Sequence, residues 1–232
     1  MHPVIRLVNR NLTISLNKGF LIWQVIFPLI YIFVAGFAYS GMIGFNIMNS
    51  TLISGIIIWN DRRHGMFEQI LVGPFTRVHY ILSNVYTIGI VGLISAALIT
   101  AVGYPLFFKS VEFNFYTIPL VVFASVSGSI LFGSIASIIS TRLQSSEGFN
   151  VVINTVFLFF AFVSTAFYPA EGTPEPLSTA FYLNPLTYLV DVVRAGIFGN
   201  FSTFVGIEMI VLIALALILF TIATKLLSKL EL

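Results

Sequence analysis

The chain has 232 residues, of which 58% are hydrophobic and only 9% are charged, with a formal net charge of +2. Soluble domains usually carry roughly 25% charged residues, so this composition excludes a globular protein covered by polar surface and indicates that lipid is the solvent. The small net charge argues against nucleic acid as a partner. The chain contains no cysteine, which excludes disulfides and thiolate metal sites.

The first expected element is an amphipathic helix over residues 3–18. Val4, Val8, Leu12 and Leu16 recur at every fourth position, and polar residues lie off this stripe. A helix with one apolar face and one basic, polar face is typical of a segment that lies in the membrane interface.

The next run is long enough for two membrane spans. No charged residue occurs between Lys18 and Asp61, and a single span needs roughly 20 residues. We therefore expect spans at about 20–40 and 43–60, joined by a tight turn near Ser40–Gly44.

The second of these spans is polar for its length. Polar side chains inside a bilayer usually face other helices or a cavity rather than lipid. Lining of a transport pathway and helix packing are both open interpretations for the candidates on this span, which are Asn46, Asn49 and Thr51.

Residues 61–77 form a charge-rich, amphipathic segment between long apolar runs. We expect a short helix here, with Asp61 near its start, where a carboxylate favours the positive end of the dipole, and Pro74 at its end. The helical spacing predicts an apolar side that contains Met66, Phe67, Ile70 and Leu71. Glu68 and Gln69 face elsewhere and form a polar side. The segment is either an interfacial helix that binds nothing or a helix presented to a cytoplasmic partner.

Three further spans are expected at about 81–106, 118–140 and 149–168. The fourth span is rich in small residues, which suit close packing between membrane helices. The fifth span is rich in phenylalanine, most of which we interpret as lipid contacts and packing, although a minority could line an apolar path. The pathway candidates on this span are Asn154, Phe157 and Phe160.

Residues 169–200 are broken by four prolines and contain helical pieces that are too short to span. Irregular backbone at membrane depth is tolerated only when it is buried in protein or lines water, so a re-entrant or surface-lying segment is expected. Asp191 and Arg194 are three positions apart on one helix face, a spacing that predicts a structural ion pair. The last span is expected at about 203–224.

Six spans place both termini on one side of the membrane. Most of the basic residues fall on that side, whereas Lys109 and Arg194 fall on the other. The positive-inside rule therefore predicts a multi-pass protein of the cell membrane, with its termini and residues 61–77 in the cytoplasm.

Motifs for hydrolysis are absent from the sequence. There is no G-x-x-x-x-G-K-[ST] phosphate loop, no G-x-S-x-G elbow and no H-E-x-x-H motif. We therefore expect no catalytic, cofactor or metal site in this chain, and energy for active transport would come from another polypeptide.

Two segments resemble the ABC-2 type transporter permease family. Residues 60–74, N-D-R-R-H-G-M-F-E-Q-I-L-V-G-P, resemble the family pattern E-R-x-x-G-T-x-E-x-L-x-x-x-P after span two. Residues 167–169 and 183–194 resemble its F-[FY]-P and N-P-[LF]-[TY]-Y-x-x-[DE]-x-x-R stretch before span six. The chain departs from the family in a very short connection between spans one and two, and at His64 and Met66.

The resemblance implies an all-α integral membrane fold with six spans, an interfacial helix, a cytoplasmic coupling helix and a broken outer helix. It implies that a separate ABC ATP-binding subunit, which binds ATP and magnesium, docks on the coupling residues Arg62, Arg63, Gly65, Met66, Phe67, Glu68, Gln69, Leu71 and Pro74. Two copies of the chain would form the pore, with spans two and five nearest the axis. The outer mouth would be capped by a segment containing Pro169, Asn184, Pro185, Tyr188, Asp191 and Arg194.

Three functional hypotheses follow. The first is the permease subunit of an exporter that moves a hydrophobic or amphipathic compound, drug-like or lipid, out of the cytoplasm, because the spans are rich in phenylalanine and poor in acids. The second is export of a lipid-linked glycan or polymer, which needs a wide aromatic-lined channel. The third, from another class, is a non-transporting membrane scaffold or a passive channel, whose activity would be indifferent to ATP.

Overall fold

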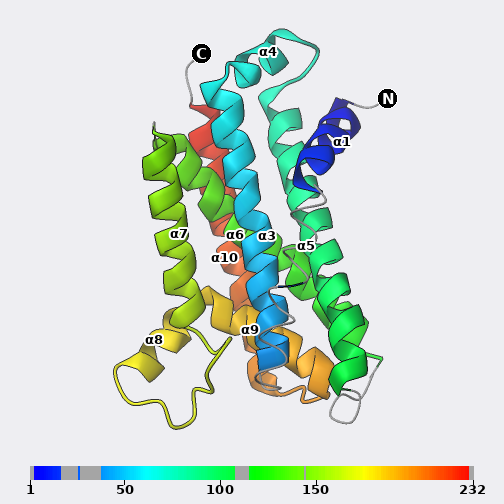
Figure 1. Ribbon diagram of the computed structural model, residues 1–232, viewed down its shortest axis with the longest axis vertical. Helices are drawn as coiled ribbons and strands as arrows, with labels where there is room; N and C mark the ends of the chain where they lie inside the picture. The colour runs from blue at the N-terminus through cyan, green and yellow to red at the C-terminus, as the bar shows by residue number, and fades with distance from the viewer. Residues whose placement is uncertain (1–2, 17–25, 27–37, 108–114, 144, 230–232) are drawn as a thin grey trace.

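Long helices run side by side through the molecule, with short helices at both ends (Figure 1). The computed structural model describes residues 3–16, 26, 38–107, 115–143 and 145–229. Within these ranges the secondary structure is entirely helical, which confirms the expected class. The helices are α1 (Pro3–Ser15), α3 (Ala38–Arg63), α4 (Met66–Val72), α5 (Arg77–Phe107), α6 (Thr117–Arg142), α7 (Ser146–Phe162), α8 (Leu177–Leu183), α9 (Pro185–Phe198) and α10 (Thr203–Ser228).

Four of the described helices, α3, α5, α6 and α10, are long and apolar enough to cross a bilayer, judged by length and composition. Helix α10 has 26 residues, which corresponds to about 39 Å at 1.5 Å per residue. Helix α7 is also apolar but has only 17 residues. The expected first span at 20–40 lies almost entirely outside the described residues.

The turn expected near Ser40–Gly44 is wrong, because α3 runs without a break from Ala38 to Arg63. The small residues serve packing instead. A methyl group placed on Gly41 would lie 1.8 Å from the carbonyl oxygen of Ala166, so glycine lets α3 approach that backbone closely.

The small residues of α6 are buried, as the sequence predicts, and this helix packs against α3, α5, α9 and α10. A methyl group on Gly128 would lie 2.8 Å from the side chain of Leu189 on α9. The buried small residues of α6 include Ser125, Ser127, Gly128, Ser129, Gly133, Ser134 and Ser137. They allow α6 to occupy the centre of the helical bundle.

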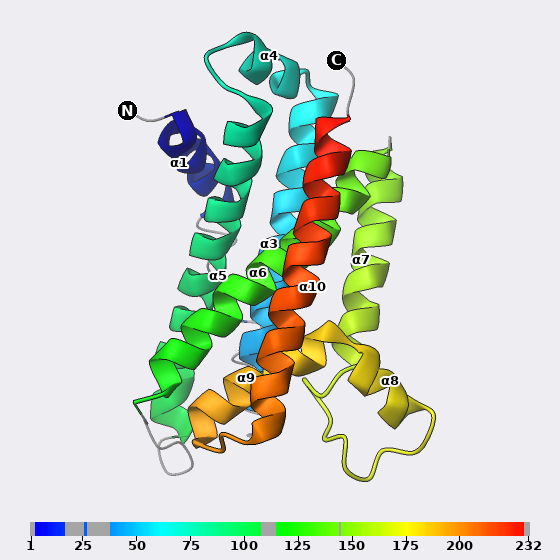
Figure 2. The same ribbon diagram turned by 180° about the vertical axis from the view of Figure 1, so that it is seen from behind.

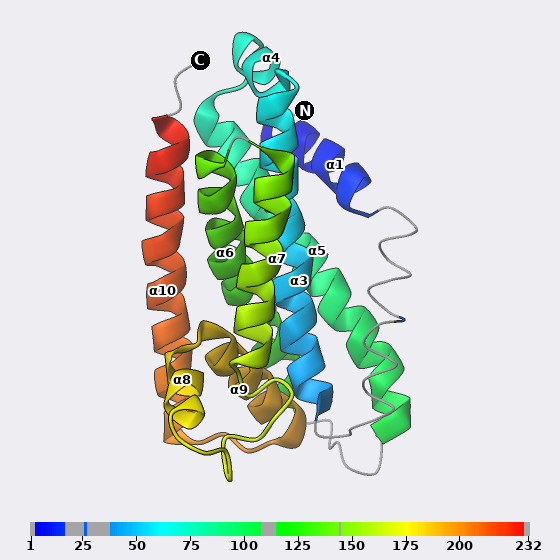
Figure 3. The same ribbon diagram turned by 60° about the vertical axis from the view of Figure 1, so that its left-hand side comes forward.

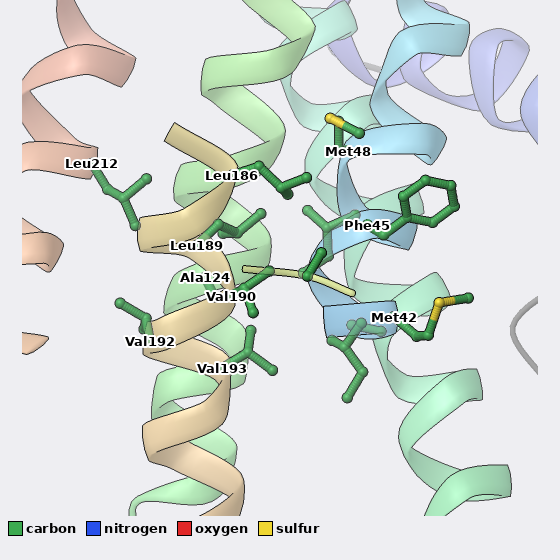
Figure 4. Close-up of a cluster of buried hydrophobic side chains, with 14 of the residues drawn as sticks. Met42, Phe45, Met48, Ala124, Leu186, Leu189, Val190, Val192, Val193 and Leu212 are labelled. Atoms are coloured by element: carbon green, nitrogen blue, oxygen red, sulfur yellow. The ribbon is translucent and has the colours of Figure 1, made fainter. Parts of the chain in front are cut away.

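The main hydrophobic core lies where α9 meets α3 and α6. Leu189 and Val190 of α9 are fully buried there, and Figure 4 shows them between Met42 and Phe45 of α3 and Ala124 of α6. Leu212 reaches the same cluster from α10. A helix too short to span is therefore held inside the bundle by apolar burial.

Helix α1 is shorter than the expected 3–18 and ends at Ser15. Its buried positions are Val4, Leu7 and Asn11, which follow the 3.6-residue period rather than the stripe at every fourth residue. Val8 and Leu12 are only half-buried. The packed face therefore includes a polar residue that the apolar pattern did not indicate.

Helices α1 and α4 and the last turn of α10 lie at one end of the molecule, and α8 and α9 lie at the other (Figures 1 and 2). Described basic residues gather in elements at the α4 end, namely Arg6, Arg10, Arg62, Arg63, Arg142, Lys225 and Lys229. Arg194 on α9 lies at the opposite end. The charge asymmetry on which the positive-inside argument rests is therefore present along the long axis.

Candidate functional site

The turn between α3 and α4 is built around Gly65. Its φ angle is +69°, a left-handed conformation that L-residues with a side chain adopt only at a cost. The N–H of His64 donates to the carbonyl oxygen of Asn60 at 3.0 Å, which closes the last turn of α3. Asp61 therefore belongs to that last turn, and its expected position at the start of the next helix is wrong, because α3 extends to Arg63.

Helix α4 is anchored to the bundle through one face. Phe67 and Ile70 are buried, and the ring of Phe67 meets that of Tyr80 edge-on with centroids 5.1 Å apart. Leu71 and Phe75 pack against the same cluster, whose other buried members are Leu7, Ile58 and Leu227. The cluster thus brings side chains of α4 together with side chains from α1, α3, α5 and α10.

The other face of α4 points away from the described bundle. Val72 is 87% exposed and Met66 is 39% exposed, so Met66 does not share the buried positions of Phe67 and Ile70, with which the helical spacing groups it. Glu68, Gln69 and Pro74 are also exposed. This outward surface, Met66, Glu68, Gln69, Val72 and Pro74, is called the α4 surface below.

The two arginines that precede the turn contact their own chain. The Nη1 atom of Arg62 donates to the carbonyl oxygen of Ser140 on α6 at 2.6 Å. The guanidinium of Arg63 lies 5.1 Å from the ring centre of Trp59, within the range of a cation–π contact. These side chains fix the end of α3, and their expected role in docking stays a prediction.

A buried polar network joins α1, α3 and α5 beneath α4. Arg10 forms a salt bridge with Asp61, and the hydroxyl of Tyr80 donates to the same carboxylate at 3.0 Å. Arg10 also donates to the side-chain oxygen of Asn11 at 2.9 Å, and Asn11 donates to Asn84 at 3.1 Å. The amide of Asn84 donates to the carbonyl oxygen of Tyr80 at 3.2 Å, which closes the network.

Sequence reasoning missed this network. The helix dipole is the only role that the sequence pattern gives Asp61, and no pattern predicts a partner for Arg10. The sequence offers little signal, because Asn11 directly follows Arg10 and Asn84 directly follows Ser83, so neither asparagine interrupts an apolar run. Residue spacing along one helix cannot reveal a partner that lies 73 positions away, as Asn84 does from Asn11.

The pathway candidates on α3 and α7 fall into two environments. Asn46 and Thr51 are buried within the chain, and Asn49 is half-buried. Phe157 packs on Phe45 with ring centres 4.8 Å apart, and Phe160 meets Phe132 edge-on at 5.6 Å. The remaining candidate, Asn154, is exposed.

Helix α7 has an exposed stripe with a period of four residues. The side chains of Asn150, Asn154, Leu158 and Phe162 are all exposed along it. Phe159, on the adjacent row, is 59% exposed. The stripe is polar toward the α4 end and apolar toward the α9 end.

Asn184 is the residue that joins α7 to α9. Its side-chain oxygen accepts from the N–H of Leu186 at 2.9 Å and so caps α9, with Pro185 in the first turn. Its amide donates to the carbonyl oxygens of Phe160, at 2.8 Å, and Val163. The last carbonyls of α7 are satisfied in this way, and the helix ends at Phe162 rather than at residue 168 as expected.

The remaining outer candidates are also held locally. Arg194 donates to the Asp191 carboxylate at 2.5 Å and to the carbonyl oxygen of Thr165 at 2.9 Å; the predicted ion pair is thus present. Burial raises the pKa of Asp191, against the opposing effect of the Arg194 guanidinium. The Tyr188 hydroxyl donates to the carbonyl oxygen of Tyr182, and Pro169 is exposed.

The fold and these contacts define a class of protein. Several apolar helices of bilayer length run between a short helix with one exposed face at one end and the buried helix α9 at the other, as in a helical, multi-pass membrane protein. The chain belongs to the ABC-2 type transporter family, whose model matches residues 4–198. The matched region includes both the α4 surface and the Asn184 motif.

Two curated proteins illustrate the similarity. The chain is 27% identical over 212 residues to the putative transport permease ycf38 of Cyanophora paradoxa, a match that covers 83% of this chain and 71% of that protein. It is 24% identical over 183 residues to the inner membrane transport permease YhhJ of Escherichia coli, covering 76% of this chain and 47% of that protein. The chain thus matches about half the length of YhhJ.

Proposed function

We propose that this chain is the membrane-spanning permease subunit of an ATP-driven exporter, and that a separate ATP-binding subunit docks on the α4 surface. One observation carries the proposal: α4 is fixed to the bundle by buried Phe67 and Ile70, while Met66 and Val72 remain exposed. A helix that is anchored on one face and open on the other is suited to transmit force from a soluble partner.

The chemistry of the α4 surface suits a protein partner. Methionine is enriched at protein–protein interfaces, and Glu68 and Gln69 add a hydrogen-bonding edge beside Met66 and Val72. The partner would bind ATP and magnesium, because the sequence lacks a phosphate loop. ATP binding would act by favouring one conformation of the permease over the other.

The exposed stripe of α7 supports a second copy of the chain as a further partner. Asn154 and Phe162 lie at different heights of this stripe, so a passage between two copies would be polar near the α4 end and apolar near the α9 end. An apolar exit favours a hydrophobic or amphipathic substrate over a strongly charged one. The homodimer would lie in the cell membrane with both termini in the cytoplasm.

Crosslinking tests the docking surface. Because the chain contains no cysteine, the variant V72C carries a single thiol on α4, to which a maleimide photo-crosslinker can be attached in native membranes. The control is L183C on α8, which is 80% exposed at the opposite end of the molecule. Crosslinked products would be identified by mass spectrometry.

We expect V72C, and not L183C, to crosslink to a protein that contains a phosphate loop. In intact cells, a membrane-impermeant maleimide should label L183C and leave V72C unlabelled. Labelling of V72C from outside, or crosslinking of both variants to the same proteins, would overturn the proposed orientation and docking surface.

A further inference from the structure

A groove of about 720 Å³ lies between α5 and α6, outside the elements already assigned a role. One wall is formed by α5, with Leu93, Ala97 and Ala101, and the other by α6, with Ile118 and Val122. The parts of α5 and α6 nearest the α9 end lie next to each other in Figure 2, on the side away from α7. The groove exists because the side chains that α5 turns toward it are mostly alanines.

The hydroxyl groups of the two threonines that line the groove are both hydrogen-bonded within the chain. The hydroxyl of Thr100 donates to the carbonyl oxygen of Ala96 at 2.7 Å. The hydroxyl of Thr117 donates to the carbonyl oxygen of Gly196 on α9 at 2.6 Å. Since the other described lining residues are aliphatic, an aliphatic chain would gain dispersion energy here.

The position of the groove along the helices indicates the source of the aliphatic chain that would bind there. Phe115 and Tyr116, immediately before α6, are 86% and 62% exposed, and exposed aromatic residues mark the membrane–water interface. The α5 wall from Leu93 to Ala101 is about 12 Å long at the rise of an α-helix. That length covers most of the hydrocarbon of one leaflet, which is about 15 Å thick.

We propose that this groove binds one acyl chain of a membrane phospholipid from the leaflet at the α9 end. The headgroup would lie near Tyr116, and the chain would run along Ala101 and Ala97 toward Leu93. Thr117, whose hydroxyl is bonded to Gly196, is both a wall of the groove and a support of α9. A bound chain would therefore brace the contact between α6 and α9.

Photolabelling in a defined bilayer tests this inference. The full chain would be reconstituted into vesicles of dioleoyl phosphatidylcholine that contain a phosphatidylcholine with a diazirine at the middle of one acyl chain. After irradiation, adducts would be mapped by mass spectrometry. Two variants fill the groove from opposite walls, A97W and V122W, and the matched control A214W places the same ring on an exposed position of α10.

We expect adducts in the unmodified chain to concentrate at residues 93–101 and 117–122. A97W and V122W should each reduce that labelling at least several-fold, and A214W should leave it unchanged. Even labelling of all lipid-facing helices, or equal losses in the three variants, would overturn the proposal. Labelling by a diazirine-bearing free fatty acid, but not by the phospholipid, would also overturn it. Two variants on different helices keep the test decisive if one of them does not fold.

Discussion

Arg10 and Asp61 are 51 positions apart in the sequence and form a salt bridge between α1 and the last turn of α3. The Tyr80 hydroxyl donates to the same carboxylate, and the ring of Tyr80 supports Phe67 of α4. Helices α1 and α4 are therefore connected through the Asp61 carboxylate and the side chain of Tyr80.

Removing either charge of this pair should destabilise the protein. We expect R10Q and D61N each to lower the free energy of unfolding by about 2 kcal/mol, because each leaves a mostly buried charged partner without its counterpart. The double variant should lose less than the sum of the two. Unfolding would be followed by circular dichroism in mixed micelles, with exposed Arg142→Gln as the control. Additive losses would show that the two residues do not interact.

The left-handed conformation of Gly65, in the turn before α4, predicts that alanine substitutions at Gly65 and at Gly206 of α10 change stability in opposite directions. A methyl group would meet nothing within 4 Å at Gly65 or at Gly206, but Gly65 alone has a positive φ of 69°. G65A should therefore lower stability by about 1–2 kcal/mol, whereas G206A in α10 should raise it by up to about 1 kcal/mol. The same micelle unfolding measurement compares them. A neutral G65A would contradict the left-handed turn.

A steric prediction concerns the packing of α3. G41A should lower stability by at least about 2 kcal/mol, because the added methyl group would overlap the backbone of Ala166 and force the helix to shift. Gly89 on α5 is the control, since a methyl group there meets nothing within 4 Å. G89A should be neutral or slightly stabilising. Equal effects of the two substitutions would argue against the continuous, closely packed α3.

Asn184 provides a test of the junction between α7 and α9. N184D keeps the oxygen that caps α9 but removes the amide that donates to Phe160 and Val163. Because Asn184 is 3% exposed, this change buries a carboxylate against two carbonyl oxygens and should cost about 2 kcal/mol or more. Limited proteolysis of the chain in vesicles should then show faster cleavage between residues 163 and 183. Asn200, which is exposed, is the control, and N200D should cleave at the original rate.

Much of the helical framework could be predicted from hydrophobic runs. The positions of α5, α6 and α10 follow from uncharged stretches of bilayer length, and the small residues of α6 indicated its burial. The two helices after residue 169 follow from their prolines and the Asn184–Pro185 pair, because asparagine caps helices and proline suits their first turn.

Other features depended on tertiary contacts that no local pattern records. Gly41 resembled a turn residue, yet it serves close packing because its partner, Ala166, is distant in sequence. Asp61 lies in the same charged run as Arg62 and Arg63, but its partner Arg10 lies on another helix. Glycine and aspartate are common in turns and at helix ends. Only the contacts in the folded chain show that Gly41 and Asp61 are instead packed against distant segments of the chain.

The continuity of α3 has a mechanical consequence. Its 26 residues form a rod about 39 Å long, with Arg63 beside the α4 turn at one end and Gly44 against Val190 of α9 near the other. No interruption divides the rod over its described length. A displacement imposed on α4 would accordingly reach α9 as a tilt or a slide of one stiff lever, rather than as a sequence of separate local rearrangements.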